Sequence, residues 1–334
     1  MTAKRRSSRR PTIWSLAKAA VTAHVLAQGA FVAYQLLNSD VRRTLAQPQN
    51  RAPQGVTLNE TDETEHYTRI HKLEDGIEWI SYLPKVRRHD TPILMQHGMW
   101  HGAWCWSTWQ EALAEWGWES HAISQPGHGM SPVQRPIFAC TLEYYLSFLR
   151  DAVNKLPHKP ILMGHSMGGA LTQYYLKYIG NLPAAVLVAP WALPAGLWPS
   201  MKAFWELDPV GFVTTSLTWR SDFVRSPSHA ANALLSPTSI LSPDDFYRKL
   251  GDESALVMLQ HGLWTNPDPS KISTPMLWLA GEKDAVCPES AERFSADFYH
   301  ADYRVYPGAA HNLMMEANHR EIAAHINDWL EDRG

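Results

Sequence analysis

The sequence contains few cysteines, and they lie far apart. Three occur in 334 residues, no C-x-x-C pair is present, and their number is odd. These features argue against a disulfide framework or a zinc site, so we expect free thiols. An excess of basic residues is also lacking, since the formal net charge is −3. This balance offers no basic face, and nucleic acid is not expected as a partner.

Glycine-rich phosphate-binding motifs are missing, so no cofactor is expected. Acidic residues are absent before Asp40, whereas basic residues gather in the opening MTAKRRSSRR. A charge-free segment at 19–37 has a length close to a bilayer span, but polar side chains such as His24 interrupt it. Residues 1–65 are therefore interpreted as a membrane anchor, a targeting segment, or an ordinary packed helix with a linker. The chain is then membrane-associated or cytoplasmic, and its oligomeric state stays open.

From about residue 66, short apolar runs alternate with segments of helical spacing. Strands are predicted at 77–83, 92–96, 119–123, 160–163, 184–189, 275–280 and 303–306. Helices are predicted at 106–116, 142–156 and 320–330, and from the end of the fourth strand to about 179. This alternation predicts an α/β fold with a mostly parallel sheet and helices on both faces.

The alternation stops between residues 191 and 271. This segment is rich in Pro, Ser and Trp and has no strand pattern, so we expect a helical insertion that divides the core into 66–190 and 272–334. The chain has 15 tryptophans, which either build a large core or line a pocket for an apolar ligand. The same two interpretations stay open for the tryptophans at the start of and within the insertion, which are Trp191, Trp198, Trp205 and Trp219.

The hexapeptide GHSMGG, from Gly164 to Gly169, directly follows an apolar strand and precedes a helix. The pattern G-x-S-x-G at such a junction is typical of a nucleophile elbow. The turn is tight, and glycines at 164 and 168 relieve the crowding because they lack Cβ. The pattern predicts Ser166 as a nucleophile at the positive end of the following helix.

A serine nucleophile needs a base, and the base needs an orienting acid. Asp284 follows the strand 275–280, and His311 follows the next strand. Both lie at carboxyl ends of strands, where sites form in open α/β sheets. The chain order of Ser166, Asp284 and His311 agrees with this chemistry. Glu282 is a less favoured acid because it lies closer to the strand end.

Two backbone amides are expected to form an oxyanion hole. One is the amide of Met167, which follows the nucleophile, and the other is that of Met99, in the loop after the strand 92–96. His97 and His101 in this loop suggest a metal site, but no third ligand has a suitable spacing. We expect no metal and interpret His97 as a hydrogen-bonded brace of the loop.

The motifs HGMWHGAW, PGHGMS, GHSMGG, GEKD and GAAH, in this order, resemble those of the α/β-hydrolase superfamily over about residues 67–334. The loop 97–104 resembles that of the plant methylesterase and hydroxynitrile-lyase branch and its bacterial relatives. The resemblance implies an α/β-hydrolase fold in which 191–271 is a lid. A serine at 166 argues against the branches that use aspartate. Gln125 departs from the family pattern, because many members have Asp before Pro-Gly-His-Gly.

We therefore expect a serine hydrolase, of the esterase and lipase-like branch, that cleaves uncharged, partly apolar small-molecule esters. Trp100 and Trp104 beside the oxyanion loop, together with Trp191, are the candidate substrate-binding residues. Three alternatives stay open: a lyase or C–C hydrolase that uses the same triad, a non-catalytic ligand-binding member of the fold, and a cofactor-free perhydrolase. The sequence does not specify the natural substrate.

Overall fold

The computed structural model describes residues 13–193, 202, 205–263 and 267–333. The chain divides into two units, Met1–Ser39 and Asp40–Gly334. The described part of the first unit is the helix α1 (Ile13–Leu37), which contains the segment 19–37. Among the described residues, α1 included, no helix combines the length and the apolar character needed to cross a membrane.

The second unit is built on one nine-stranded sheet with the order β1-β2-β3-β5-β4-β6-β7-β8-β9. The strands are β1 (Val56–Glu63), β2 (Tyr67–Glu74), β3 (Ile77–Pro84), β4 (Ile93–Gln96), β5 (Ser120–Ser124), β6 (Ile161–His165), β7 (Ala185–Val188), β8 (Met276–Gly281) and β9 (Asp302–Tyr306). The pairs from β1 to β3, and β3 with β5, are antiparallel, and the remaining pairs are parallel. The predicted α/β class with a mostly parallel sheet is confirmed.

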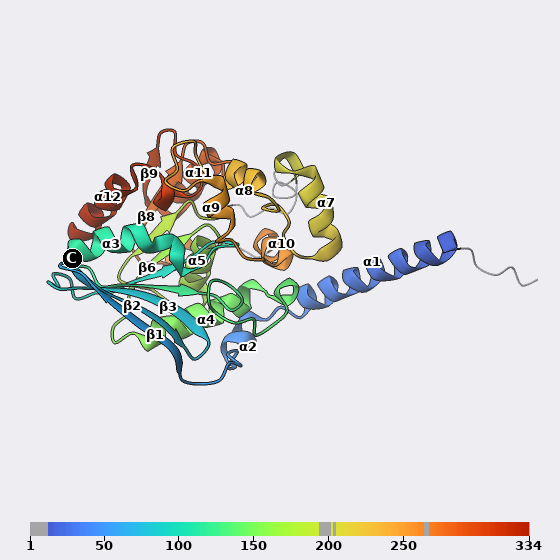
Figure 1. Ribbon diagram of the computed structural model, residues 1–334, viewed down its shortest axis with the longest axis horizontal. Helices are drawn as coiled ribbons and strands as arrows, with labels where there is room; N and C mark the ends of the chain where they lie inside the picture. The colour runs from blue at the N-terminus through green and yellow to red at the C-terminus, as the bar shows by residue number, and fades with distance from the viewer. Residues whose placement is uncertain (1–12, 194–201, 203–204, 264–266, 334) are drawn as a thin grey trace, which may run out of the picture. The chain divides into compact units, whose positions relative to one another are not determined.

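Helices cover both faces of this sheet. The principal ones are α3 (Ser107–Glu115), α4 (Leu142–Lys155), α5 (Met167–Tyr178), α11 (Glu289–Tyr299) and α12 (His319–Glu331). Helices α3 and α12 pack against each other, as do α4 and α5. Figure 1 shows α3 and α12 on one side of the strands and α4 on the other. The central strands β4, β6, β7 and β8 are buried along their whole length, which explains why each reads as a continuous apolar run.

The first two strands were not predicted. The sheet begins at Val56 rather than at residue 66, because β1 lies inside the segment that the sequence analysis left outside the core. Most residues of β1 are polar and exposed, and those of β2 are half-buried. Neither strand therefore carries the apolar pattern on which the prediction depended.

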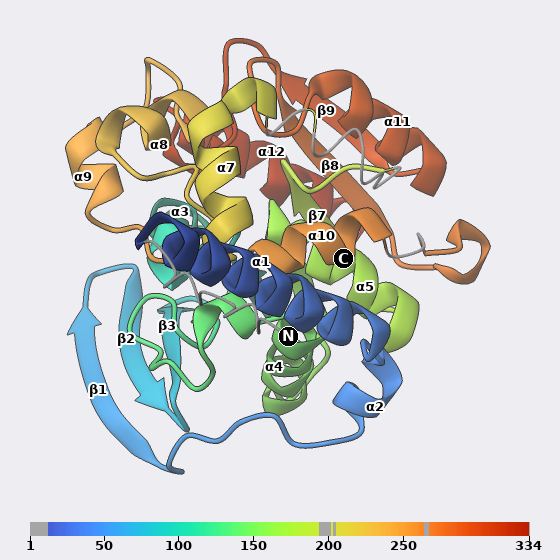
Figure 2. The same ribbon diagram turned by 90° about the vertical axis from the view of Figure 1, so that its right-hand side faces the viewer.

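The segment between β7 and β8 is helical, with no strand among its described residues, and its principal described helices are four. They are α7 (Pro209–Thr218), α8 (Pro227–Leu234), α9 (Pro243–Tyr247) and α10 (Ala255–Leu263). Helices α8 and α9 are in contact, and Figure 2 shows α7 beside them. Trp198 lies outside the described residues. Trp205 is 49% exposed and Trp219, the residue that ends α7, is half-buried, so neither is a fully buried core residue.

Candidate active site

Ser166 occupies a strained turn between β6 and α5. Its backbone has φ 54° and ψ −118°, a combination that non-glycine residues rarely adopt. The turn is closely packed, because a Cβ at Gly164 would lie 2.3 Å from the carbonyl oxygen of Gly168. A Cβ at Gly168 would lie 2.2 Å from the carbonyl oxygen of Gln96. Both glycines are thus required by close backbone approach, and Ser166 stands directly before the N-terminus of α5.

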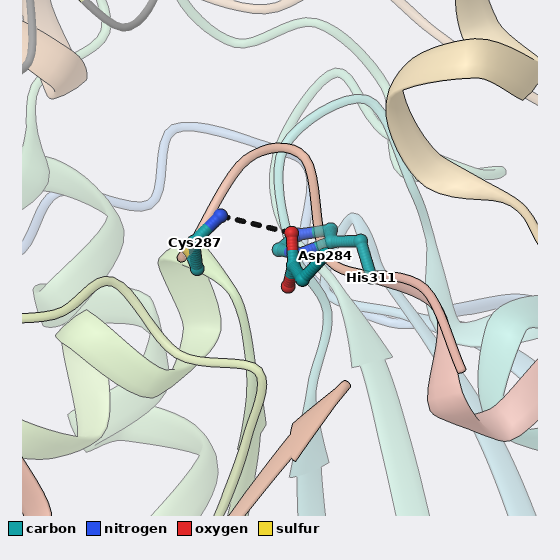
Figure 3. A group of neighbouring side chains, drawn as sticks. All are labelled: Asp284, Cys287 and His311. Atoms are coloured by element: carbon teal, nitrogen blue, oxygen red, sulfur yellow. Dashed lines mark hydrogen bonds and ion pairs between the residues drawn. The ribbon is translucent and has the colours of Figure 1, made fainter. Parts of the chain in front are cut away.

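Asp284 and His311 meet although 27 positions separate them. His311 Nδ1 lies 2.6 Å from Asp284 Oδ2, and both side chains are buried. The other carboxylate oxygen, Oδ1, accepts hydrogen bonds from the amides of Val286 and Cys287 at 2.7 and 2.8 Å. Figure 3 shows His311 beside Asp284, with the amide of Cys287 bonded to the carboxylate. The carboxylate is fixed on both sides, so it can hold the imidazole in one orientation.

Cys287 completes a cluster whose geometry would suit a metal ion. One donor atom each from Asp284, Cys287 and His311 lie within 4.8 Å of one another. The carboxylate oxygens are engaged by the imidazole and the two amides, however. Burial, with a smaller effect of Asp284, raises the pKa of the Cys287 thiol well above its ordinary value, and a protonated thiol is a poor ligand. All three cysteines of the chain are buried and unpaired.

The loop after β4 approaches the nucleophile through Gly98. A Cβ at this position would lie 2.8 Å from the Cβ of Ser166, so the loop backbone runs directly against the serine. Met99 follows in the same loop. Within the described residues, the amides of Met99 and Met167 donate no hydrogen bond to protein groups. These two amides therefore remain without a protein acceptor, one directly after Ser166 and the other directly after Gly98.

His97 fixes the direction of the Met99 amide. The amide of Gln125 donates to His97 Nε2 at 3.0 Å, which leaves Nδ1 as the protonated nitrogen. His97 Nδ1 then donates to the carbonyl oxygen of Gly98 at 2.7 Å. Because the peptide unit is planar and trans, holding this carbonyl turns the N–H of Met99 the opposite way. Gln125, the departure from the family pattern, contributes through its backbone, and its side-chain amide donates to Gln96 at 2.6 Å.

His101 joins the loop after β4 to residues 307–318, which connect β9 to α12 and carry His311 (the histidine loop). The sequence analysis missed this link. Asn312 Nδ2 lies 3.2 Å from His101 Nε2, and His101 Nδ1 lies 2.6 Å from the carbonyl oxygen of Met99. Burial lowers the pKa of His101 to about 4, so the ring is neutral at pH 7 and bridges as donor and acceptor. His165 adds a second link, because its Nε2 lies 3.2 Å from the carbonyl oxygen of His311.

The three candidate substrate-binding tryptophans lie around this site in different ways. The amide of Trp191 donates to the carbonyl oxygen of Ser166 at 3.2 Å, and its side chain is buried. Trp100 is buried, and its indole donates to the carbonyl oxygen of Ser221 in the insertion at 3.4 Å. Trp104 is half-buried and stacks on His101, with 5.5 Å between the ring centroids. All three border the loops that carry the candidate catalytic groups.

The chain is similar to known proteins in sequence and in fold. The model of the alpha/beta hydrolase family matches residues 93–325. The chain is 33% identical to pFDCC methylesterase MES16 of Arabidopsis thaliana over 107 residues, which are 31% of this chain and 40% of that protein. It is 27% identical to a monoacylglycerol lipase of Mycolicibacterium smegmatis over 63% of this chain and 77% of the lipase. The fold resembles that of a thermophilic esterase from Thermogutta terrifontis, with a TM-score of 0.59 and 19% identity over 83% of this chain and 99% of the esterase.

Proposed function

The chain belongs to the alpha/beta hydrolase family, and from this premise we propose that it hydrolyses carboxylic esters through an acyl-enzyme on Ser166. The observation that carries the proposal is the buried contact of 2.6 Å between His311 and Asp284. An imidazole whose Nδ1–H is held by a carboxylate presents Nε2 as a base. The relatives named methylesterase and monoacylglycerol lipase support an ester as the substrate.

The proposed reaction begins when His311 takes the proton from Ser166 Oγ and the alkoxide attacks the ester carbonyl. The amides of Met99 and Met167 donate to the oxyanion, which collapses as His311 protonates the leaving alcohol. Water, deprotonated by His311, then attacks the acyl-enzyme and releases the acid. Asp284 holds the productive tautomer and stabilises the imidazolium throughout.

We further propose that the substrates are uncharged, partly apolar esters bound beside Trp100, Trp104 and Trp191. Aromatic rings offer large apolar contact areas for such groups. The expected result is faster turnover of neutral p-nitrophenyl esters than of esters with a charged acyl group of the same length. Faster turnover of the charged esters would contradict this assignment.

The nucleophile is tested by labelling with a fluorophosphonate probe. Wild type and the control Ser147→Ala, a buried serine in α4, should be labelled, whereas Ser166→Ala should not. Turnover of p-nitrophenyl butyrate by Ser166→Ala should fall by at least ~10⁴-fold, since triad members act as a unit. Labelling of Ser166→Ala would refute the assignment of Ser166 as the nucleophile. A labelled wild type without ester turnover would refute ester hydrolysis but not the nucleophile. Assays with a cyanohydrin and a vinylogous diketone would then distinguish a lyase from a C–C hydrolase.

A further inference from the structure

Glu316 is a buried carboxylate that the triad chemistry does not use. Its exposed fraction is 2%, and it follows His311 within the histidine loop. Oε1 accepts a hydrogen bond from the amide of Ala310 at 2.8 Å. Oε2 accepts from Ser236 Oγ at 2.5 Å and from Thr238 Oγ1 at 3.1 Å. Three donors therefore compensate for the burial of this carboxylate, and charge-assisted hydrogen bonds of this kind are strong.

The two hydroxyl donors come from the insertion, in the segment 234–240, which begins at the last residue of α8 and leads towards α9. The backbone of this segment is also hydrogen-bonded to that of the histidine loop. The amide of Asn312 donates to the carbonyl oxygen of Leu234 at 3.1 Å, and the amide of Ile240 donates to that of Met315 at 2.8 Å. Ser239 and Glu316 form an isolated antiparallel bridge. Glu316 thus lies where the insertion and the histidine loop are joined.

Glu316 acts on the backbone immediately before the candidate base. Asp284 holds the ring of His311, and His165 holds its carbonyl oxygen. Glu316 holds the amide of Ala310, which precedes His311. Without this acceptor, the buried N–H of Ala310 has no partner, and relieving that cost requires the loop to move. A shift of the loop moves the imidazole away from the serine.

We propose that Glu316 is a positioning residue that holds His311 in place and makes this placement depend on the segment 234–240 of the insertion. The proposal rests on the proposed function of His311 as the base. Glu316 touches no reacting atom and acts through Ala310 alone.

The test compares three variants in the full chain. Glu316→Ala should lower kcat for p-nitrophenyl acetate by about 10²-fold, the size of effect that a misplacement of about 1 Å can cause, with little change in KM. Glu316→Gln should retain most of the wild-type kcat, because its amide oxygen can still accept from Ala310 and the two hydroxyls can turn to accept from its NH₂ group. The matched control is Glu253→Ala. Glu253 is also fully buried; it accepts from Tyr145 and Ser254 and lies 3.1 Å from His128. Because it does not contact the histidine loop, its replacement should lower kcat much less than Glu316→Ala does.

A second measurement does not depend on turnover. The proton shared by His311 and Asp284 should give a low-field ¹H NMR signal, assigned by its loss in Asp284→Asn. We expect this signal in wild type and Glu253→Ala, and we expect it to broaden or vanish in Glu316→Ala. If Glu316→Ala does not fold, Ser236→Ala removes one donor from the insertion and should weaken the signal and lower kcat to a smaller extent.

An unchanged kcat and an unchanged signal in the folded variant would overturn the proposal. A loss of kcat equal to that of Glu253→Ala would also overturn it, because it would reflect general loss of stability. If wild type is not labelled by the fluorophosphonate probe, the proposed function fails, and the NMR signal still decides whether Glu316 positions His311.

Discussion

The turn after β6 and the inserted segment 191–271 reach the same site but are fixed by different contacts. At the turn, backbone groups are in close contact: Ser166 has a positive φ, and Gly168 leaves no room for a Cβ beside Gln96. In the insertion, hydrogen bonds of buried side chains supplement those of the backbone. Glu316 binds two of its hydroxyls, and its own Glu253 lies 3.1 Å from His128 of the core.

This difference has a physical consequence for how each region tolerates change. A Cβ at position 168 would lie 2.2 Å from the carbonyl oxygen of Gln96. A change of side-chain rotamer cannot relieve a clash with the backbone, so the whole turn must move. A side-chain hydrogen bond can be lost or replaced one partner at a time. We therefore expect the loops of the core to fix the chemistry and the insertion to adjust substrate choice and the placement of the base.

The largest expected effect is on kcat/KM and concerns Asp284, the proposed acid of the triad. Asp284→Asn should reduce kcat/KM by ~10⁴-fold, because the amide favours the wrong imidazole tautomer. The matched control is Glu282→Gln in the same loop, an exposed residue that accepts from the amide of Gly308. Steady-state kinetics with p-nitrophenyl butyrate give kcat/KM for both variants. A loss in Glu282→Gln together with an unchanged kcat/KM in Asp284→Asn would show that Glu282, and not Asp284, is the acid.

Two buried histidines, one in the core and one in the insertion, allow a second comparison. Burial lowers the pKa of His101 in the core and of His261 in the insertion to about 4. Above pH 6.5 both are neutral in the folded and unfolded states. As the pH falls from 6.5 towards 4, only the unfolded chain takes up these protons, so folding loses stability, by about 3 kcal/mol for each histidine.

Urea denaturation at pH 7 and pH 4 measures this loss. His101→Gln and His261→Gln should each reduce the difference in free energy of unfolding between the two pH values. The turnover should fall further in His101→Gln, because only His101 contacts Met99 and Asn312. A pH dependence identical to wild type in both variants would contradict the assignment.

A smaller effect is expected from a pair of glycine substitutions. Gly168→Ala should destabilise the fold by about 1–3 kcal/mol through overpacking at the turn and should abolish probe labelling. Gly251→Ala in the insertion, where the nearest atom would lie 3.9 Å from the new Cβ, should do neither. Thermal unfolding and labelling of both variants provide the test. Similar losses in the two variants would remove the distinction between the regions.

The smallest expected effect concerns substrate choice. Trp104→Ala should change the ratio of kcat/KM between butyrate and acetate p-nitrophenyl esters by about 10-fold, the usual scale for an apolar contact. The ring is half-buried and adjoins Phe246 of α9, so it is a contact between the oxyanion loop and the insertion. An unchanged ratio would exclude Trp104 from the substrate pocket.

Much of this architecture was predictable from local sequence. The strands from β3 to β9 were found because their apolar runs stand between turn residues, and GHSMGG marked the turn at Ser166 by spacing alone. The strand β1 was missed because its exposed residues are polar. The contact of His101 with Asn312 spans 211 positions, and that of Ser236 with Glu316 spans 80. No local sequence pattern predicts contacts over such separations.

The α/β alternation, the family and the order of the candidate catalytic residues were thus predictable from the amino-acid sequence, because these depend on periodicity and on short motifs. Which buried polar groups pair with one another became evident in the folded chain. Each such pairing depends on where distant segments come to lie when the sheet forms and the insertion packs on it. The partners of Glu316, Glu253 and His101 are of this kind, because a buried polar group must find its hydrogen bonds wherever the packing places them.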